Sequence, residues 1–493
     1  MRFLFKKIAF PGGRTLETIN HPQYIIGGPR RYRTAAKEKT FKVCVMLDSL
    51  KNFRRNYLET LKALPFLDCY FSDMPASWDD APKEPVTPYR KLSFTEGNPR
   101  LVKQTDHSFE EIAAMAEKSP EVDFIIASGD RKMLYHIAVL EELIAKYPNL
   151  YLCTAAVCNP FFLEHLVERK LTDKVLYGSM TPYLAPGQAL APVVLGKFDW
   201  ATKCAIAGNN FRKLLGEAPV TPPELPTPVI PQIMIDTHTH TLEPGMTSRF
   251  PAPSSAPVWA QWEDRLDYLG VTHMFCTPSN AIRDVATYPS RGIRDFCVQS
   301  AGRVRYFEVF DPNSSEGSLR QLEASLPDPL CVGIKIHPAC HGVDADDPRY
   351  EAVFAIAAKY GKPIMSHTWG VSDYNPTQKH SVPNLFDKYL TAYPDVKFVF
   401  GHTGGRPNGF VFAAEMCRKH PQCMGDLAGD LFNNGFVTHA LKEIGADRIM
   451  FATDMYWIDP RCVLGMLLDQ EFLSDEELFA VLRRNAERFY LGR

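Results

Sequence analysis

The sequence lacks the features that would place it in several specialised classes of protein. It contains no run of about 18 apolar residues, so no segment is long enough to form a transmembrane helix. Its 55 basic and 57 acidic side chains leave a net charge of −2, which gives no sign of a nucleic-acid-binding surface. None of its 12 cysteines forms a C-x-x-C pair, and each lies singly in an apolar segment. This pattern favours buried, reduced thiols over a disulfide framework.

The first residues, MRFLFKKIAFPGG, also lack a long apolar core, because Lys6 and Lys7 interrupt them. A secretion signal needs a longer uninterrupted apolar segment than this one. Together with the single cysteines, this predicts a cytoplasmic protein that has neither a membrane nor a nucleic acid as partner.

A proline-rich stretch divides the chain. Residues 217–231, EAPVTPPELPTPVIP, contain six prolines, which lack backbone N–H donors and favour an extended, semi-rigid conformation. The length of 493 residues is enough for two or three domains. We therefore expect one domain over residues 1–216, a linker over 217–231 and a second domain over 232–493.

The second of these domains shows a regular alternation of short β-rich runs and amphipathic helical stretches. The runs are QIMIDTHTH, VTHMFCTP, VRYFEVFDP, CVGIKIHP, KPIMSHT, VKFVFGHTG, QCMGDLAGD and DRIMFATDMY. Eight strand–helix units in about 260 residues, with strands apolar on both faces, are typical of a (β/α)8 barrel. An open doubly wound sheet is the alternative, but no Gly-rich phosphate-binding loop follows any run. We predict an α/β fold with a TIM barrel here.

Polar residues end nearly all of these runs. In a (β/α)8 barrel the carboxyl ends of the strands meet at one face, where catalytic groups are placed. In chain order the polar ends are His238 and His240, Thr277, Asp311, Lys335 and His337, His367, His402, Asp426 or Asp430, and Asp454. Because residues two apart in a strand point to the same side, His238 and His240 face the mouth of the barrel together.

A single H-x-H pair is weak evidence for a metal, because many histidines merely end a strand. The histidines and Asp454 at the ends of later strands strengthen the evidence for a metal. Buried imidazoles beside the carboxylate of Asp454 would be costly unless an ion satisfied them. Three neutral nitrogens and one carboxylate suit one divalent ion, with Zn²⁺ as the best match and Mn²⁺, Fe²⁺ or Co²⁺ as alternatives.

Six motifs in this domain also match a known family: IDTHTH, GIKIHP, PIMSHT, FVFGHTGG, IMFATDMYW and RRNAERFYLG. Through them the segment from about residue 232 to the end resembles the amidohydrolase-related branch of the amidohydrolase superfamily. The resemblance implies that one catalytic ion and a water are held by four ligands, His238, His240, His367 and Asp454. It also implies that His402 is an acid–base or substrate-polarising residue that does not bind the ion.

The family that this segment resembles includes lactonases, other hydrolases and non-oxidative decarboxylases. We expect a metal-dependent hydrolase, in which activated water attacks the carbonyl of a lactone, amide or ester in a small anionic substrate. Asp454 would accept the water's proton, and His402 would stabilise the oxyanion. The alternative is a metal-dependent non-oxidative decarboxylase of an aromatic or unsaturated carboxylic acid. A non-enzymatic scaffolding protein is a third possibility, but it would not use the complete set of metal ligands.

Four more residues near the strand ends are candidates for binding substrate. We interpret Lys335 as a charged barrel residue that binds an anionic substrate or pairs with a carboxylate, with a carboxylated lysine bridging two ions as the alternative. His337 is either a substrate contact or a structural histidine, and Arg406 either meets a substrate carboxylate or is a solvated loop arginine. Trp369 either walls the pocket or packs in the core.

The N-terminal part resembles the second half of the same barrel. VDFIIASGD aligns with VKFVFGHTG, and KVLYGSMTPY aligns with RIMFATDMYW. These alignments pair Ser128 with His402 and Met180 with Asp454, and 52 residues separate the two positions in each copy. Gln104 takes the place of His367. Because none of these side chains replaces a metal ligand, we expect a degenerate, incomplete amidohydrolase-like α/β domain.

The first half of this copy is short. Before Gln104, only FKVCVMLDSL (41–50) and FLDCYFSD (66–73) suggest strands. An incomplete parallel sheet leaves unpaired edges, so we expect it to pack on the catalytic barrel or on another subunit of a homo-oligomer. A small ligand pocket of its own is the alternative role.

Overall fold

The structure is a computed structural model that describes residues 28–70, 90–93, 99–104, 106–127, 136–241, 259–373 and 375–492. Ser128 lies outside the described residues. The chain divides into two compact units, Met1–Ser49 and Leu50–Arg493, and the contacts discussed below lie within the second. Among the described residues, no helix combines the length and the hydropathy needed to cross a membrane.

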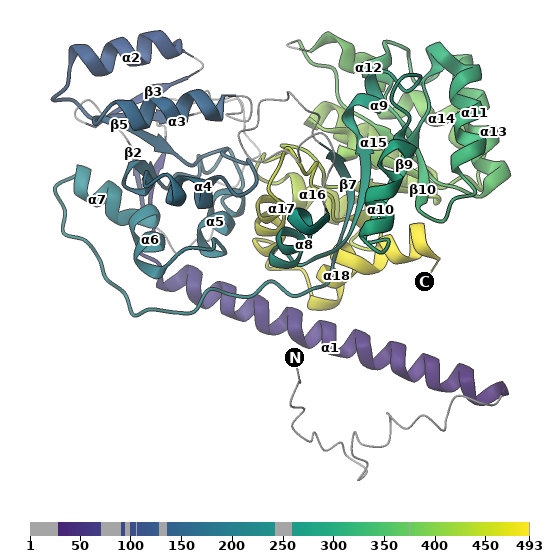
Figure 1. The fold of residues 1–493 in the computed structure, drawn as a ribbon, viewed down its shortest axis with the longest axis horizontal. Helices are drawn as coiled ribbons and strands as arrows, with labels where there is room; N and C mark the ends of the chain where they lie inside the picture. Colours follow the sequence, from purple (N-terminus) through teal and green to yellow (C-terminus); the bar gives the residue numbers. More distant parts are fainter. Residues whose placement is uncertain are drawn as a thin grey trace. The chain divides into compact units, whose positions relative to one another are not determined.

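The second unit contains a barrel of eight parallel strands arranged in chain order. They are β7 (Met234–Thr241), β8 (Val271–Pro278), β9 (Val304–Val309), β10 (Cys331–Ile336), β11 (Ile364–His367), β12 (Phe398–Gly401), β13 (Cys423–Asp426) and β14 (Ile449–Met450). A bridge between Thr239 and Met455 joins the two ends of the sheet, and the Thr237 N–H donates to the Phe451 carbonyl at 3.2 Å. The predicted (β/α)8 barrel is therefore confirmed (Figure 1).

Helices alternate with these strands and cover the barrel (Figure 1). The longer ones are α8 (Trp259–Tyr268), α10 (Arg294–Gln299), α11 (Ser315–Ser325), α13 (Glu351–Tyr360), α14 (Asp387–Ala392), α15 (Pro407–Lys419), α16 (Phe436–Glu443) and α17 (Pro460–Leu468). Short helices α9 (Ser279–Arg283), α12 (Pro338–His341) and α18 (Asp475–Phe479) lie between them, and the π-helical η11 (Ala480–Arg484) and η12 (Glu487–Leu491) end the chain.

Each strand contributes one apolar side chain to a buried layer inside the barrel. The layer consists of Ile235, Phe275, Phe307, Val332, Met365, Val399, Met424 and Met450, joined by Ala486 and Phe489 from the C-terminal segment. Burial of apolar surface at about 25 cal/mol per Å² makes this layer a main source of stability. It fixes the strand positions, and therefore the places at which their polar carboxyl ends meet.

Upstream, a second parallel sheet has the order β3 (Arg100–Lys103), β4 (Phe124–Ala127), β5 (Leu150–Cys153) and β6 (Val175–Leu176). Its helices are α2 (Phe109–Lys118), α3 (Ile137–Lys146), α4 (Phe162–Glu168), α5 (Gly187–Val194), α6 (Trp200–Cys204) and α7 (Asn210–Leu214). The strands β1 (Leu67–Tyr70) and β2 (Arg90–Ser93) form a separate parallel pair. Residues 217–231 contain neither helix nor strand.

Hydrogen bonds of this second sheet repeat those of the barrel's second half. The Asn210 side-chain amide donates to the carbonyls of Thr172 and Val175, at 2.7 and 2.8 Å. The Asn485 amide donates in the same way to Ala446 and Ile449, both at 2.7 Å. Likewise the Thr181 N–H donates to Ser179 Oγ, as the Met455 N–H does to Thr453 Oγ1. The sheet β3–β6 therefore has the local geometry of β11–β14.

Two expectations for the N-terminal part are wrong. Residues 41–50 form no strand but belong to the long helix α1 (Gly28–Ala63), which Pro29 and Pro65 bracket. Its buried Leu50, Phe53, Tyr57 and Leu61 recur at helical spacing, and this packing outweighs the local alternation of β-branched residues.

The register also places Lys103, not Gln104, at the position of His367. Lys103 pairs with Ala127 as His367 pairs with Gly401.

Candidate metal centre

The two histidines of β7 are held so that one nitrogen of each faces the same carboxylate. His240 Nδ1 lies 2.9 Å from the Thr277 carbonyl, which can only accept, so this nitrogen carries the proton. His238 Nδ1 lies 3.0 Å from Asp426 Oδ2. The Nε2 atoms of His240 and His238 lie 3.1 and 3.5 Å from Asp454 Oδ1. Both Nε2 lone pairs therefore point toward one place.

Asp454 reaches this place from the segment that follows β14. Its N–H donates to the His238 carbonyl at 2.9 Å, and its φ of +64° turns the chain sharply. Burial alone would raise the pKa of Asp454, but the imidazoles of His402, His238 and His240 hold it well below its ordinary value. Burial also keeps the pKa of His238 well below its usual range, with Lys335 adding to this effect. The group thus combines the neutral imidazole of His238 with the ionised carboxylate of Asp454.

This donor set fits a divalent metal ion. One atom from each of His238, His240 and Asp454 lies within 4.8 Å of the others. Imidazoles that bind a metal through one nitrogen usually donate the other N–H to a carboxylate or carbonyl, as Asp426 and Thr277 provide here. Neutral nitrogens and a carboxylate are also the donor types that a first-row divalent ion prefers.

The predicted fourth ligand, His367, has a different neighbourhood. Its Nε2 lies 2.9 Å from Gln378 Oε1. Its ring stacks on His337, with centroids 4.0 Å apart and planes 8° apart, and is nearly parallel to the Trp369 ring at 6.0 Å. Its centroid lies 4.7 Å from that of His402. His367 therefore borders the site as part of a flat stack, and its role as a ligand stays a prediction.

His402 lies directly beside the donor group. Its Nδ1 is 3.0 Å from the Ala428 carbonyl and 3.8 Å from Asp454 Oδ2. Its backbone N–H donates to Asp426 Oδ1 at 2.7 Å. Burial lowers the pKa of His402 to about 4, so the ring is neutral near pH 7. A neutral imidazole at this point can polarise a substrate or relay a proton.

Lys335 supplies a cation inside the same group. Its side chain is 1% exposed, and its Nζ lies 2.7 Å from His238 Nε2. Burial lowers the pKa of Lys335 to about 8, although the nearby carboxylates of Asp454 and Asp426 oppose this shift. The site therefore places a lysine nitrogen next to His238, a predicted metal ligand.

The other residues that were predicted to bind substrate differ in how closely they approach this donor group. Trp369 is 5% exposed, and its ring meets His402 edge-on at 5.5 Å. His337 belongs to the flat stack, and its Nδ1 accepts the Cys340 N–H at 3.1 Å. Arg406 is partly exposed and precedes α15.

Two buried carboxylates, Asp426 and Asp236, support the site, although the sequence alone gave neither of them a role. Asp426 contacts both His238 and His402, as described above. Asp236 accepts from the Thr453 hydroxyl at 2.5 Å and from its N–H at 3.1 Å, which fixes the residue before Asp454. Asp426 was visible in the sequence as a strand end and Asp236 as part of the motif IDTHTH, but their partners are 188 and 217 residues away.

The barrel matches a known protein family. A family described as Amidohydrolase matches residues 235–491. No curated protein matches the chain. Among solved structures, a 5-carboxyvanillate decarboxylase from Sphingomonas paucimobilis is 14% identical, with 52% of this chain and 98% of that chain covered and a TM-score of 0.41.

Two further solved structures show similarity of the same order. A 2,6-dihydroxybenzoate decarboxylase from Rhizobium is 16% identical, covering 52% of this chain and 99% of that chain with a TM-score of 0.41. An uncharacterised TIM-barrel protein from Bordetella bronchiseptica is 18% identical, covering 53% and 99% with a TM-score of 0.42. The matched family segment, in contrast, spans more than half of the chain and contains the entire barrel with its donor set. The chain belongs to the amidohydrolase family.

Proposed function

We propose that the chain is a metal-dependent decarboxylase of a small, planar aromatic or unsaturated carboxylic acid. The observation that carries this proposal is Lys335, whose nitrogen lies 2.7 Å from a metal-ligand nitrogen and is buried. A cation at this point would hold a substrate carboxylate at the reaction centre itself. In a hydrolase of an anionic substrate, the scissile carbonyl would occupy that place and the carboxylate would bind further away.

The flat stack of His337, His367 and Trp369 favours a planar substrate. Its three rings are nearly parallel, with ring planes that differ by only 8° and 4°. A conjugated substrate ring that extended this stack would be oriented beside the donor group.

The residues that would hold the ion are His238, His240 and Asp454, with His367 as the predicted fourth ligand. A bound divalent ion, for which this donor set suits Zn²⁺, would supply a Lewis acid that stabilises negative charge on the substrate. In the reaction the carbon–carbon bond to the carboxylate breaks, CO₂ leaves, and its bonding electrons remain on the substrate carbon. That carbon takes one proton, and the adjacent Asp454 and His402 are placed to relay it from solvent.

A hydrolase is the second candidate, because His402 and Asp454 also suit an attack by water. Their Nδ1 and Oδ2 atoms lie 3.8 Å apart, beside the same donor group. Asp454 would accept a proton from the attacking water, and His402 would stabilise the oxyanion that forms at the carbonyl.

The two candidates differ in their products. We expect the Zn²⁺- or Mn²⁺-loaded chain to release CO₂ from at least one member of a panel of hydroxybenzoates and unsaturated dicarboxylic acids. Lys335→Met should reduce kcat/KM for that acid about 10–100-fold, because a charge-assisted contact to the carboxylate is lost. Lys359→Met, which removes a surface pair with Glu323 and a cation–π contact with Tyr360, is the matched control. Acid release from lactones or amides, with unchanged kinetics in Lys335→Met, would contradict the proposal.

A further inference from the structure

Two loops at the mouth of the barrel carry residues that adjoin the metal centre. Residues 455–461 follow Asp454 and lead into α17. Residues 427–435 follow β13 and include Ala428, whose carbonyl lies 3.0 Å from His402 Nδ1. Loops at such positions usually open more easily than the strands that they follow. In this chain, both loops are bound by segments of the N-terminal part.

The first loop is anchored through Asp459, which is 2% exposed. Its N–H donates to the Cys158 carbonyl at 2.7 Å, and its Oδ2 accepts from the Phe161 N–H at 3.1 Å. These backbone contacts join positions about 300 residues apart in the chain. The loop therefore cannot shift without breaking hydrogen bonds that are buried or partly buried.

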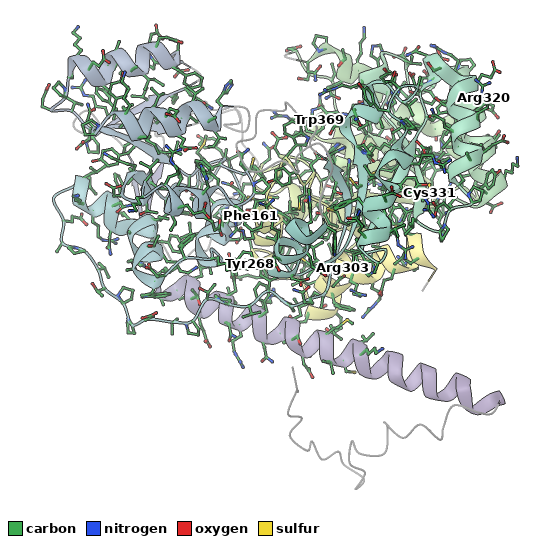
Figure 2. The ribbon with its side chains drawn as sticks, viewed as in Figure 1. Phe161, Tyr268, Arg303, Arg320, Cys331 and Trp369 are labelled. Carbon is green, nitrogen blue, oxygen red and sulfur yellow. The ribbon has the colours of Figure 1, made fainter. Side chains whose placement is uncertain are left out.

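A buried charge cluster strengthens this anchor. The guanidinium of Arg461, 1% exposed, lies 2.7 Å from Asp459 Oδ2 and 3.0 Å from Glu164 Oε2. The rings of Phe161 and Tyr268 flank it, with centroids 5.3 and 5.7 Å from its central carbon. Figure 2 shows these two rings next to each other, and their centroids are 6.1 Å apart. Two carboxylates thus hold one buried guanidinium, and loss of the Glu164 charge would leave Arg461 paired with Asp459 alone.

The second loop pairs with residues 182–185. The Ala185 N–H donates to the Phe432 carbonyl at 2.7 Å, and the Asn434 N–H donates to the Tyr183 carbonyl at 3.0 Å. The Asn434 side chain also donates to the Pro182 carbonyl at 3.0 Å. Together with the antiparallel bridge between Leu184 and Asn433, these bonds fasten residues 432–434 to residues 182–185.

We propose that the N-terminal part positions the metal centre, with Glu164 as the positioning residue for the loop of Asp454 and residues 182–185 as the positioning segment for the loop behind His402. The proposal rests on the proposed function of that centre. None of these residues touches the donor atoms. They act by holding the loop that follows Asp454 and the loop whose Ala428 carbonyl contacts His402, so that both side chains are arranged before an ion binds.

The test measures binding of Zn²⁺ alone to the full chain, together with amide hydrogen exchange. Glu164→Gln removes one charge from the cluster and should weaken Zn²⁺ binding about tenfold, as losses outside the ligand set do. Exchange in residues 455–461 should become faster. Asp328→Asn is the matched control, because it breaks a partly buried pair with Arg294 before β10, at the opposite end of the barrel. It should leave Zn²⁺ affinity unchanged.

A second variant covers the case in which Glu164→Gln does not fold. Asn434→Ala removes only the bond to Pro182 and should speed exchange in residues 427–435 while leaving that of β9 and β10 unchanged. Unchanged Zn²⁺ affinity in folded Glu164→Gln, or unchanged exchange in Asn434→Ala, would overturn the proposal. Failure of the metal centre itself is distinguishable, since Zn²⁺ binding would then survive in the His238→Ala, His240→Ala double variant.

Discussion

At the residue scale, the metal centre depends on the atoms that hold the far side of each imidazole. The Thr277 carbonyl fixes the tautomer of His240, and Asp426 faces Nδ1 of His238. The spacing of His238 and His240 in one strand was enough to predict that they share a face. The contact of Asp426 was not predictable, because it depends on how strands far apart in the chain are closed into a barrel.

Replacement of Asp426 tests this support. In Asp426→Asn, the imidazole of His238 loses its charged partner while the side-chain volume is retained. We expect Zn²⁺ affinity to fall about 10–100-fold, measured by competition with a chelating dye. Asp395→Asn, at an exposed position before β12, should bind Zn²⁺ like the wild-type chain. Equal affinities in the two variants would show that Asp426 does not support His238.

At the element scale, the strands of the barrel were predictable because each one is an apolar run with a polar end. The helix α1 was not, since residues 41–50 alternate like a strand over a short window. Only the longer stripe that includes Leu50 and Phe53 reveals the helical period. The end of α5 is held by a side chain from the next helix: the buried Lys203 donates to the carbonyls of Val193, Val194 and Gly196, at 3.1, 2.8 and 2.7 Å.

This buried lysine predicts a pH dependence of stability. Burial, with a smaller contribution from Arg461, lowers the pKa of Lys203 to about 7 from an ordinary value of 10.5. Between these pH values the unfolded chain binds more protons than the folded chain, so the free energy of unfolding should rise with pH. The contribution is at most about 1.4 kcal/mol per pH unit.

Lys203→Met should flatten this rise, because methionine keeps much of the side-chain length without a titrating group. Urea unfolding of both proteins from pH 7.5 to 9.5 gives the comparison, with Lys359→Met as a control on the surface. The same slope in Lys203→Met and in the wild-type chain would refute the assignment.

At the scale of the whole molecule, the N-terminal part and the barrel share an interface whose contacting residues the sequence did not reveal. The repeat was recognisable because it preserves the local order of strands and helices. The contacts of Glu164 with Arg461 were not, since they join side chains 297 residues apart and leave no local pattern. The expectation that the incomplete sheet packs on the barrel agrees with these contacts.

The closest approach in this interface is between α5 and α17. A Cβ added at Gly465 would lie 2.0 Å from the Gly187 carbonyl oxygen and 2.7 Å from Ala191 Cβ. Gly465→Ala should therefore force the helices apart and lower the free energy of unfolding by about 1–3 kcal/mol. Gly317→Ala in α11, where an added Cβ meets nothing within 4 Å, should instead raise it by about 0.5–1 kcal/mol. Denaturant unfolding of the two variants checks both signs, and a neutral Gly465→Ala would contradict this packing.

The pairing of α5 with α17 also has a consequence during synthesis on the ribosome. The two helices end at Val194 and Leu468, which are 274 residues apart. At about 5–20 residues per second, roughly 14–55 s pass between the translation of these two positions. For that time the nascent N-terminal part exposes the surface that α17 will later cover, including the carboxylate of Glu164. Translation speed between these helices therefore sets how long a chaperone has access to that surface.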